Sequence, residues 1–292
     1  MRSDPADFEL IAPRTLQAVV SLLAEQPRQW VPIAGGTDVM VQYAAGNLAS
    51  QKLVSICNLP ELRGIEALSG EIRIGAGCTY TELREHSVVV KEFPLLASAA
   101  AWTGGITNQN RGTLGGNIVN ASPAGDSLPA LLAYEAELIL VSVRGDRRVP
   151  YIGFHTGYKK MNLGHDELIR SICLARRFSG YLHYGRKVGA REAQAISKVC
   201  IAGLGQIRGG SMDDVRIALG SVAPVPMRLV EVEQIVQGRS VDRELLQSAR
   251  KTTANAIQPI DDIRSTAKYR AAVAGNLVAE FLEQLCNSAM TS

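Results

Sequence analysis

Ile33-Ala-Gly-Gly-Thr-Asp38 joins a short apolar strand, Trp30–Ile33, to a helical pattern over residues 39–45. Paired glycines after a strand permit positive φ angles and leave the backbone N–H groups uncovered. Thr37 adds a hydroxyl donor, and the helix that follows adds the partial positive charge of its N-terminus. The loop predicts a nest of N–H groups for a phosphate or pyrophosphate, although a tight strand–helix turn alone would need the same residues.

A second stretch, Arg111-Gly-Thr-Leu-Gly-Gly-Asn117, repeats this chemistry with a hydroxyl, a Gly-Gly pair and an amide. It continues through Asn120-Ala-Ser-Pro-Ala-Gly-Asp126, which presents a carboxylate after a proline turn. Asp126 is unsuited to a phosphate, but it can accept a hydrogen bond from a ribose or ribityl hydroxyl. The pattern predicts a second phosphate nest, with a carboxylate beside it that can accept hydrogen bonds from hydroxyl groups of the ligand.

The two loops together favour one dinucleotide site over two unrelated turns. A pyrophosphate carries two negative charges, and each charge-assisted hydrogen bond from an N–H group contributes about 1.5–3 kcal/mol. About four or five converging donors would therefore hold it without a lysine or arginine. Two phosphate nests and a carboxylate that can bind ligand hydroxyl groups indicate a dinucleotide such as FAD. Two unrelated loops remain the alternative.

Hydrophobic periodicity in the first half of the chain mixes helices and strands. Leu16, Val19, Val20 and Leu23 recur at helical spacing, with Thr15 as the candidate N-cap. The predicted helices cover residues 13–24, 39–45, 79–85, 91–102 and 128–134, and the predicted strands cover 30–33, 53–56, 71–74, 137–143 and 147–150. The last two strands read as a hairpin joined at Arg144-Gly-Asp146.

The second half reads as strands followed by helices, which is typical of an α+β domain. An antiparallel sheet is expected from residues 181–188, 200–208 and 214–220, and helices from 228–236, 242–256 and 266–287. Gly203-Leu-Gly205 lacks the third glycine of a dinucleotide fingerprint, so we assign it to a strand. The predicted domains are 1–178, with subdomains of about 1–57 and 58–178, and 179–287.

Composition excludes several classes of protein. The 292 residues are 46% hydrophobic and 20% charged, as in an ordinary globular chain. The net charge of +3 gives no basis for a nucleic-acid or membrane surface. The five cysteines form no Cys-x-x-Cys pair and the four histidines are dispersed, so we expect no iron–sulfur cluster or metal site in this chain. No signal region or membrane-spanning run is visible, and we expect a cytoplasmic protein.

Six blocks of sequence, spread over nearly the whole chain, carry a specific resemblance. The first three are Ala34-Gly-Gly-Thr-Asp38, then Asn58-Leu-Pro-Glu-Leu-Arg-Gly-Ile65 with Ile74-Gly-Ala-Gly-Cys-Thr79, then Gly112-Thr-Leu-Gly-Gly-Asn117 with Ala121-Ser-Pro-Ala-Gly-Asp126. The last three cover residues 187–199, 218–228 and 260–270. In this order they resemble the FAD-binding medium subunits of the molybdenum hydroxylases, the xanthine dehydrogenase and carbon monoxide dehydrogenase flavoprotein family.

The resemblance implies a two-domain α+β flavoprotein: an N-terminal FAD-binding domain of the vanillyl-alcohol-oxidase/PCMH type with two subdomains, and a C-terminal antiparallel sheet covered by helices. Such subunits assemble with a small [2Fe–2S] subunit and a large molybdopterin subunit as a dimer of heterotrimers. Electrons pass from the clusters through FAD to NAD or another acceptor. No catalytic residue is expected in this chain. The residues expected to hold FAD are Ile33, Ala34, Gly35, Gly36, Thr37, Asp38, Thr103, Gly104, Thr113, Leu114, Gly115, Gly116, Asn117, Asp126, Ile169 and Lys187.

Some side chains support the assignment to this flavoprotein family, and others depart from the family's sequence. The family places a lysine at Lys187, where a cation would stabilise reduced flavin; an exposed strand lysine is the alternative. Tyr184 is a candidate for stacking on the flavin ring, but a tyrosine of the core or a strand is the favoured interpretation. The family commonly has Ile-Arg-Asn where this chain has Asn108-Gln-Asn110. That departure leaves open a non-catalytic binding or assembly protein that has kept the fold and lost FAD. A stand-alone flavin oxidase is a third possibility, but no acid–base constellation supports it. We expect the partner interface to draw on residues 102–111.

Overall fold

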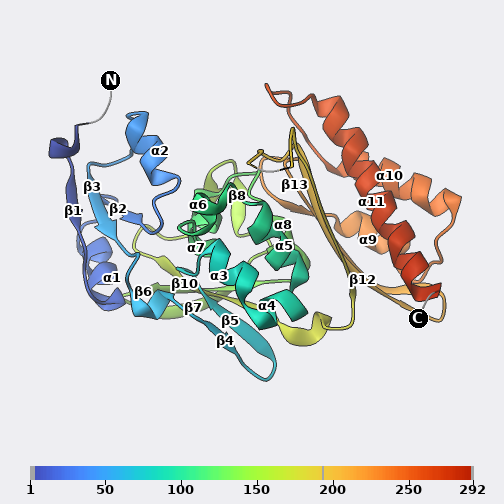
Figure 1. The fold of residues 1–292 in the computed structure, drawn as a ribbon, viewed down its shortest axis with the longest axis horizontal. Helices are drawn as coiled ribbons and strands as arrows, with labels where there is room; N and C mark the ends of the chain where they lie inside the picture. Colours follow the sequence, from blue (N-terminus) through green and yellow to red (C-terminus); the bar gives the residue numbers. More distant parts are fainter. Residues whose placement is uncertain (1–3, 193, 291–292) are drawn as a thin grey trace.

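The computed structural model describes residues 4–192 and 194–290, which fold into sheets flanked by helices (Figure 1). The strands are β1 Glu9–Ile11, β2 Trp30–Ile33, β3 Lys52–Ser55, β4 Ile65–Ala67, β5 Glu71–Gly75, β6 Glu137–Ser142, β7 Gly145–Pro150, β8 His155–Gly157, β9 Lys160–Met161, β10 Leu168–Ala175, β11 Leu182–Val188, β12 Val199–Arg208, β13 Ser211–Gly220 and β14 Met227–Arg228. The α-helices are α1 Leu16–Glu25, α2 Val39–Ala44, α3 Tyr80–Glu85, α4 Ser87–Glu92, α5 Pro94–Trp102, α6 Ile106–Gln109, α7 Leu114–Asn120, α8 Leu128–Ala133, α9 Val230–Val236, α10 Arg243–Ala256 and α11 Ala267–Met290.

A small parallel sheet of order β1-β3-β2 forms the N-terminal end of the molecule. Strand β2, helix α2 and strand β3 make the predicted strand–helix–strand unit. Helix α1 buries the predicted apolar face, and the Thr15 hydroxyl caps it by accepting a hydrogen bond from the N–H of Ala18 (3.2 Å). The predicted helix, strand and cap are therefore confirmed here.

The central sheet is antiparallel, with the order β4-β5-β10-β6-β7. Its apolar face and helices α3, α5, α7 and α8 share one core. The predicted hairpin is confirmed as β6 and β7. The central strand β10 was not predicted, because its consecutive residues Ile172–Leu174 are all buried. A strand that is buried on both faces shows no alternation of polar and apolar residues.

The C-terminal antiparallel sheet, β11-β12-β13-β14, lies between two sets of helices (Figure 1). Alternate residues of a strand point to opposite faces. Ile201 and Leu219 therefore face the core formed with α9, α10 and α11, whereas Ala202 and Leu204 join the core of α5 and α8. The predicted α+β class and the helix-covered sheet are confirmed. The packing of the second sheet face against the N-terminal part is an addition that the sequence did not reveal.

Two departures from the predicted elements have local causes. The helix predicted over residues 91–102 is divided into α4 and α5 at Phe93, because Pro94 cannot continue a helix but suits a first turn. The glycine- and asparagine-rich region 103–126, for which the periodicity predicts no helix, contains α6 and α7. Helix α7 begins inside the predicted second nest, and this changes what that nest can offer.

Candidate functional site

The first glycine loop exposes a row of hydrogen-bond donors. It leaves the carboxyl end of β2 and enters α2, and Gly36 turns the chain with a φ of 78°. Within residues 4–192 and 194–290, no protein atom accepts a hydrogen bond from the backbone N–H groups of Gly35, Gly36, Thr37 or Asp38. The loop has the free donors that a phosphate site requires.

The second glycine loop is built differently, because Thr113 caps α7 and the two glycines belong to the first turn of that helix. The first N–H groups of the helix have acceptors within the protein at 2.9–3.1 Å: Leu114 donates to the Cys78 carbonyl, Gly115 to the Ala76 carbonyl, Gly116 to the Thr113 Oγ1 and Asn117 to the Thr113 carbonyl. Gly116 does not have the positive φ that the sequence suggested. The expectation of a second open nest of backbone N–H groups is therefore wrong.

The glycines of both loops allow close packing. A Cβ atom on Gly35 would lie 1.7 Å from the carbonyl oxygen of Arg111, which is far inside contact distance. The Arg111 Nε in turn donates to the Gly35 carbonyl oxygen (3.1 Å). A Cβ on Gly115 would lie 2.7 Å from the Cβ of Ala76. The two loops are thus locked together, and the second is also fixed to the chain that follows β5.

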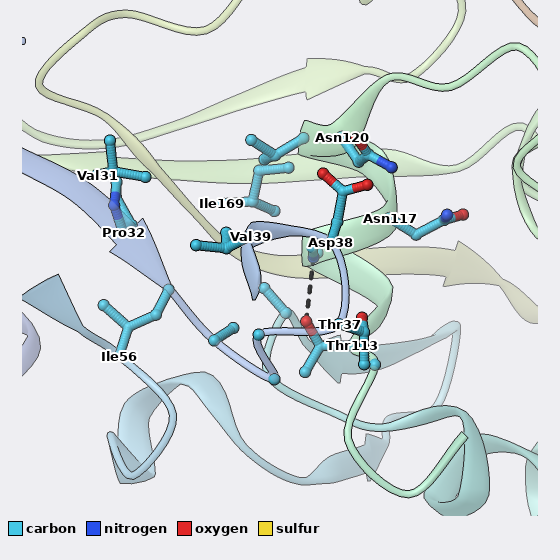
Figure 2. Close-up of a pocket in the computed structure, with 18 of the residues that line it drawn as sticks. Val31, Pro32, Thr37, Asp38, Val39, Ile56, Thr113, Asn117, Asn120 and Ile169 are labelled. Atoms are coloured by element: carbon cyan, nitrogen blue, oxygen red, sulfur yellow. Dashed lines mark hydrogen bonds between the residues drawn. The ribbon is translucent and has the colours of Figure 1, made fainter. Parts of the chain in front are cut away.

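A cavity of about 920 Å³ opens between the two loops. In the view of Figure 2, Val31, Pro32 and Ile56 lie on one side and Asn117 and Asn120 on the other, with the first loop between them. The dashed bond is the one that caps α7. The predicted residues that line the cavity are Ala34, Gly35, Gly36, Thr37, Asp38, Thr103, Gly104, Thr113, Gly115, Gly116, Asn117 and Ile169. Ile33, Leu114, Asp126 and Lys187 do not line it.

A second cavity of about 430 Å³ shares Thr103, Gly104, Asn108, Asn117 and Asn120 with the first. Its other lining residues are Gly105, Ser122, Ala124, Gly125, Asp126, Gln194, Ala195 and Ile196. This cavity lies where the N-terminal part meets the segment between β11 and β12. The shared residues make the two cavities adjoining compartments, with three asparagine amides and one threonine hydroxyl between them.

A buried ion pair stands beside the second cavity. The Lys187 Nζ donates to Asp126 Oδ2 (2.6 Å) and to the Trp102 carbonyl oxygen (2.9 Å). The Ser197 hydroxyl donates to Asp126 Oδ1 (2.5 Å). Burial raises the pKa of Asp126, and the charge of Lys187 opposes that change. The structure therefore brings these two predicted residues together and ties the C-terminal part to the N-terminal part.

Sequence reasoning missed one wall of the large cavity, which Lys159 and Glu167 help to line. Lys159, in the turn between β8 and β9, donates from Nζ to the carbonyl (2.7 Å) and Oδ1 (2.5 Å) of Asn120. Arg147 binds both carboxylate oxygens of Glu167, at 2.6 and 2.7 Å, and holds its pKa below the ordinary value. No glycine pair marks this segment; the only signal is the polar run Gly164-His-Asp-Glu167 before an apolar strand.

Two residues singled out in the sequence have structural roles. Gln109 is buried, accepts from Arg84 Nη1 (3.0 Å) and donates to the Ala101 carbonyl (2.9 Å). It lines neither cavity, whereas its neighbour Asn108 lines both. Tyr184 stacks on Phe281 inside the C-terminal core, with ring centroids 5.7 Å apart. The suggestion that Tyr184 stacks on a flavin is not supported by this position.

Comparison with known proteins agrees with this architecture. The family described as FAD binding domain in molybdopterin dehydrogenase matches residues 6–176, which is more than half of the chain. The chain belongs to the FAD-binding subunits of the molybdenum hydroxylases. The CO dehydrogenase flavoprotein C-terminal domain matches residues 185–285. The predicted family and the two-domain flavoprotein fold are thereby confirmed.

Individual relatives are similar over most of their length. The xanthine dehydrogenase FAD-binding subunit of Escherichia coli O157:H7 is 35% identical over 260 residues, with 88% of each chain covered. The carbon monoxide dehydrogenase medium chain of Hydrogenophaga pseudoflava is 29% identical, covering 95% of this chain and 96% of its own. The solved carbon monoxide dehydrogenase of that organism, in a form lacking the Mo-pyranopterin moiety, aligns with a TM-score of 0.90 at 29% identity over 94% of this chain and 95% of that one.

The geometry fits the flavin that this family binds. Ligand cavities in proteins usually measure about 300–1,000 Å³, and the larger cavity, about 920 Å³, has that size. Its rim holds the free N–H groups of the first loop. In the described ranges, no group of three His, Cys, Asp or Glu side chains could hold a metal ion. No helix described there is long and apolar enough to cross a membrane.

Proposed function

We propose that this chain binds FAD across the two cavities and passes electrons from a [2Fe–2S] partner subunit to NAD or another acceptor. The observation that carries the proposal is the row of unpaired N–H groups at Gly35, Gly36, Thr37 and Asp38, beside a cavity of about 920 Å³. These donors suit a pyrophosphate, because each forms a charge-assisted hydrogen bond without a counter-charge from a side chain.

The chain's residues divide the work of holding FAD. The first loop, Ile33 to Asp38, would bind the phosphates through its backbone. Thr113, Gly115, Gly116 and Asn117 would form the opposite wall, with Leu114 buried behind it. Asn117 Oδ1 accepts from the Ser127 hydroxyl (2.8 Å), which orients the Asn117 side chain. Thr103, Gly104 and Ile169 would line the space between. Asp126 would line the second cavity, with its charge neutralised by Lys187.

Bound FAD would supply the ability to take electrons one at a time and release them in pairs. The chain's own contribution is to bind, orient and shield the cofactor. The Asp126–Lys187 pair does this by fixing β11 against the Trp102 carbonyl, and Ser197 ties the segment between β11 and β12 to Asp126. We propose the domain division at residues 178/179, with subdomains of about 1–57 and 58–178 and a C-terminal domain over 179–287. We also place the chain in the cytoplasm.

The proposed assembly is a dimer of heterotrimers with an iron–sulfur small subunit and a molybdopterin large subunit. The names of the relatives support this, since one is the medium chain of carbon monoxide dehydrogenase. The substrate would be oxidised on the large subunit. A direct test is to express the chain with and without these partners and to measure substrate-dependent reduction of an external acceptor, which should require all three subunits.

The competing function is a binding or assembly protein that has lost FAD. Its motivation is the departure at Asn108-Gln-Asn110, in which Gln109 bonds to Arg84 and Ala101 away from the cavities and Asn108 lines both of them. The two functions separate on one measurement. The purified chain should show the visible absorbance of oxidised flavin, or regain it on titration with FAD, with one FAD bound per chain. A chain that binds no FAD would favour the assembly protein.

A further inference from the structure

The side chain of Lys159 is anchored at the wall of the large cavity. Its Nζ donates to the carbonyl oxygen (2.7 Å) and Oδ1 (2.5 Å) of Asn120, the last residue of α7, and both residues line the cavity. Figure 2 shows Asn120 on the side of the cavity away from Val31 and Pro32. An ammonium group has three N–H donors, so one donor of Lys159 remains after these two bonds.

The charges that line the large cavity do not balance without this lysine. The lining carboxylates are Asp38 and Glu167. Glu167 is paired with Arg147, whereas Asp38 accepts from the neutral amide of Gln42 (2.5 Å) and forms no ion pair within the part of the chain that the structure describes. Of the residues described, Lys159 is the only lysine or arginine that lines either cavity.

An anionic ligand would feel this distribution of charge. The free N–H groups of the first loop are dipoles without net charge, and the Asp38 carboxylate stands at the end of the same loop. Two phosphate charges beside an uncompensated carboxylate would repel it, and a cation in the same cavity offsets that repulsion. Lys159 has the charge, the fixed position and the remaining donor that this task requires.

We propose that Lys159 binds a phosphate oxygen of the dinucleotide pyrophosphate, an inference that rests on the proposed function and adds a side-chain cation to the backbone donors of the first loop. The remaining N–H of the ammonium would donate to that oxygen while Asn120 keeps the side chain in place. The alternative role is structural: a cation at the C-terminus of α7 stabilises the helix through its dipole. The two roles predict different measurements.

The experiment titrates the flavin-free, full-length chain with FAD and, separately, with ADP, which carries the pyrophosphate without the flavin. Lys159→Gln removes the charge and keeps a donor for Asn120. Its dissociation constants for FAD and for ADP should both rise about tenfold at low salt, as expected for the loss of one charge-assisted hydrogen bond. The ratio to the wild type should shrink as the ionic strength rises from about 0.01 M to about 1 M, because the Debye length falls from about 30 Å to about 3 Å. Lys159→Arg should retain most of the affinity.

The matched control is Lys160→Gln, a change at the exposed neighbour, which lines neither cavity. It should change both affinities less than about twofold. Wild-type affinity for FAD in Lys159→Gln, with only a lower thermal midpoint, would assign Lys159 the structural role and overturn the inference while leaving the FAD function intact. A loss for FAD that is absent for ADP, independent of salt, or equally large in Lys160→Gln would also overturn it. A wild-type chain that binds ADP through Lys159 but does not bind FAD would keep the phosphate site and overturn the proposed function.

Discussion

The two glycine loops look alike in sequence and differ in what they offer a ligand. Gly35-Gly-Thr37 leaves its N–H groups free, whereas the corresponding groups of Leu114, Gly115 and Gly116 are bonded to Cys78, Ala76 and Thr113. The first loop can donate hydrogen bonds to a ligand, whereas the second loop holds the surrounding structure in place. A Gly-Gly pair thus specifies close approach, but the carbonyl groups that happen to lie nearby decide whether the N–H groups remain available.

The contact between the loops should be the most sensitive point. Gly35→Ala places a Cβ 1.7 Å from the Arg111 carbonyl oxygen, so the backbone must move. We expect loss of FAD binding and a fall in the free energy of unfolding of about 1–3 kcal/mol or more. Urea unfolding of the flavin-free chain and FAD titration measure both. Gly70→Ala, which meets no atom within 4 Å, is the matched control and should change neither.

Exchanging glycine for valine in each loop tests the comparison directly. In Gly36→Val the residue must hold a φ of 78°, which costs about 1–2 kcal/mol, and its Cβ would lie 3.5 Å from the Met40 side chain at the start of α2. FAD affinity should fall at least about a hundredfold, with a small loss of stability. Gly116→Val meets the Thr113 Oγ1 at 2.8 Å, so its loss should fall mainly on the stability of α7. Equal FAD loss at equal stability in both variants would contradict the division of roles.

Removing the cap of α7 should affect the second loop alone. Thr113→Ala takes away the acceptor of the Gly116 N–H and should lower the free energy of unfolding by about 1 kcal/mol. FAD affinity should fall less than tenfold, because the first loop keeps its donors. Thr113→Ser retains the hydroxyl and serves as the control. A hundredfold loss of affinity in Thr113→Ala alone would assign the second loop a direct part in binding.

The smallest effect on FAD binding is expected at Glu167, a cavity-lining residue whose carboxylate is already bound by Arg147. Because its pKa is lowered in the folded chain, the pair contributes stability above about pH 4.3, and that stability is lost as the pH falls through the lower, folded-state pKa. In Glu167→Gln the stability near neutral pH should drop and its acid-side decline should become shallower. An unchanged profile between about pH 3 and 6 would contradict this.

The comparison also explains which parts of the site could be predicted. The first loop follows a strand and precedes a helix within a few residues, so its conformation is set locally. The Val19 and Leu23 spacing and the Thr15 cap are local in the same sense. By contrast, strand β10 has no alternation, and Lys159 reaches Asn120 across 39 positions. The sequence left two positions open for Tyr184, because a strand tyrosine can face either side of a sheet, and the structure places it in the C-terminal core.

The amino-acid sequence by itself determined the family, the α+β class and the glycine positions at which the backbone must turn or approach closely. These follow from short-range spacing and from the steric freedom of glycine. Only the tertiary structure decided which N–H groups stay free, because the acceptors at Ala76 and Cys78 come from a segment far from α7 in the chain. It likewise paired Asp126 with Lys187, 61 positions apart. Hydrogen bonds between distant segments depend on how sheets and helices pack, and no local pattern encodes them.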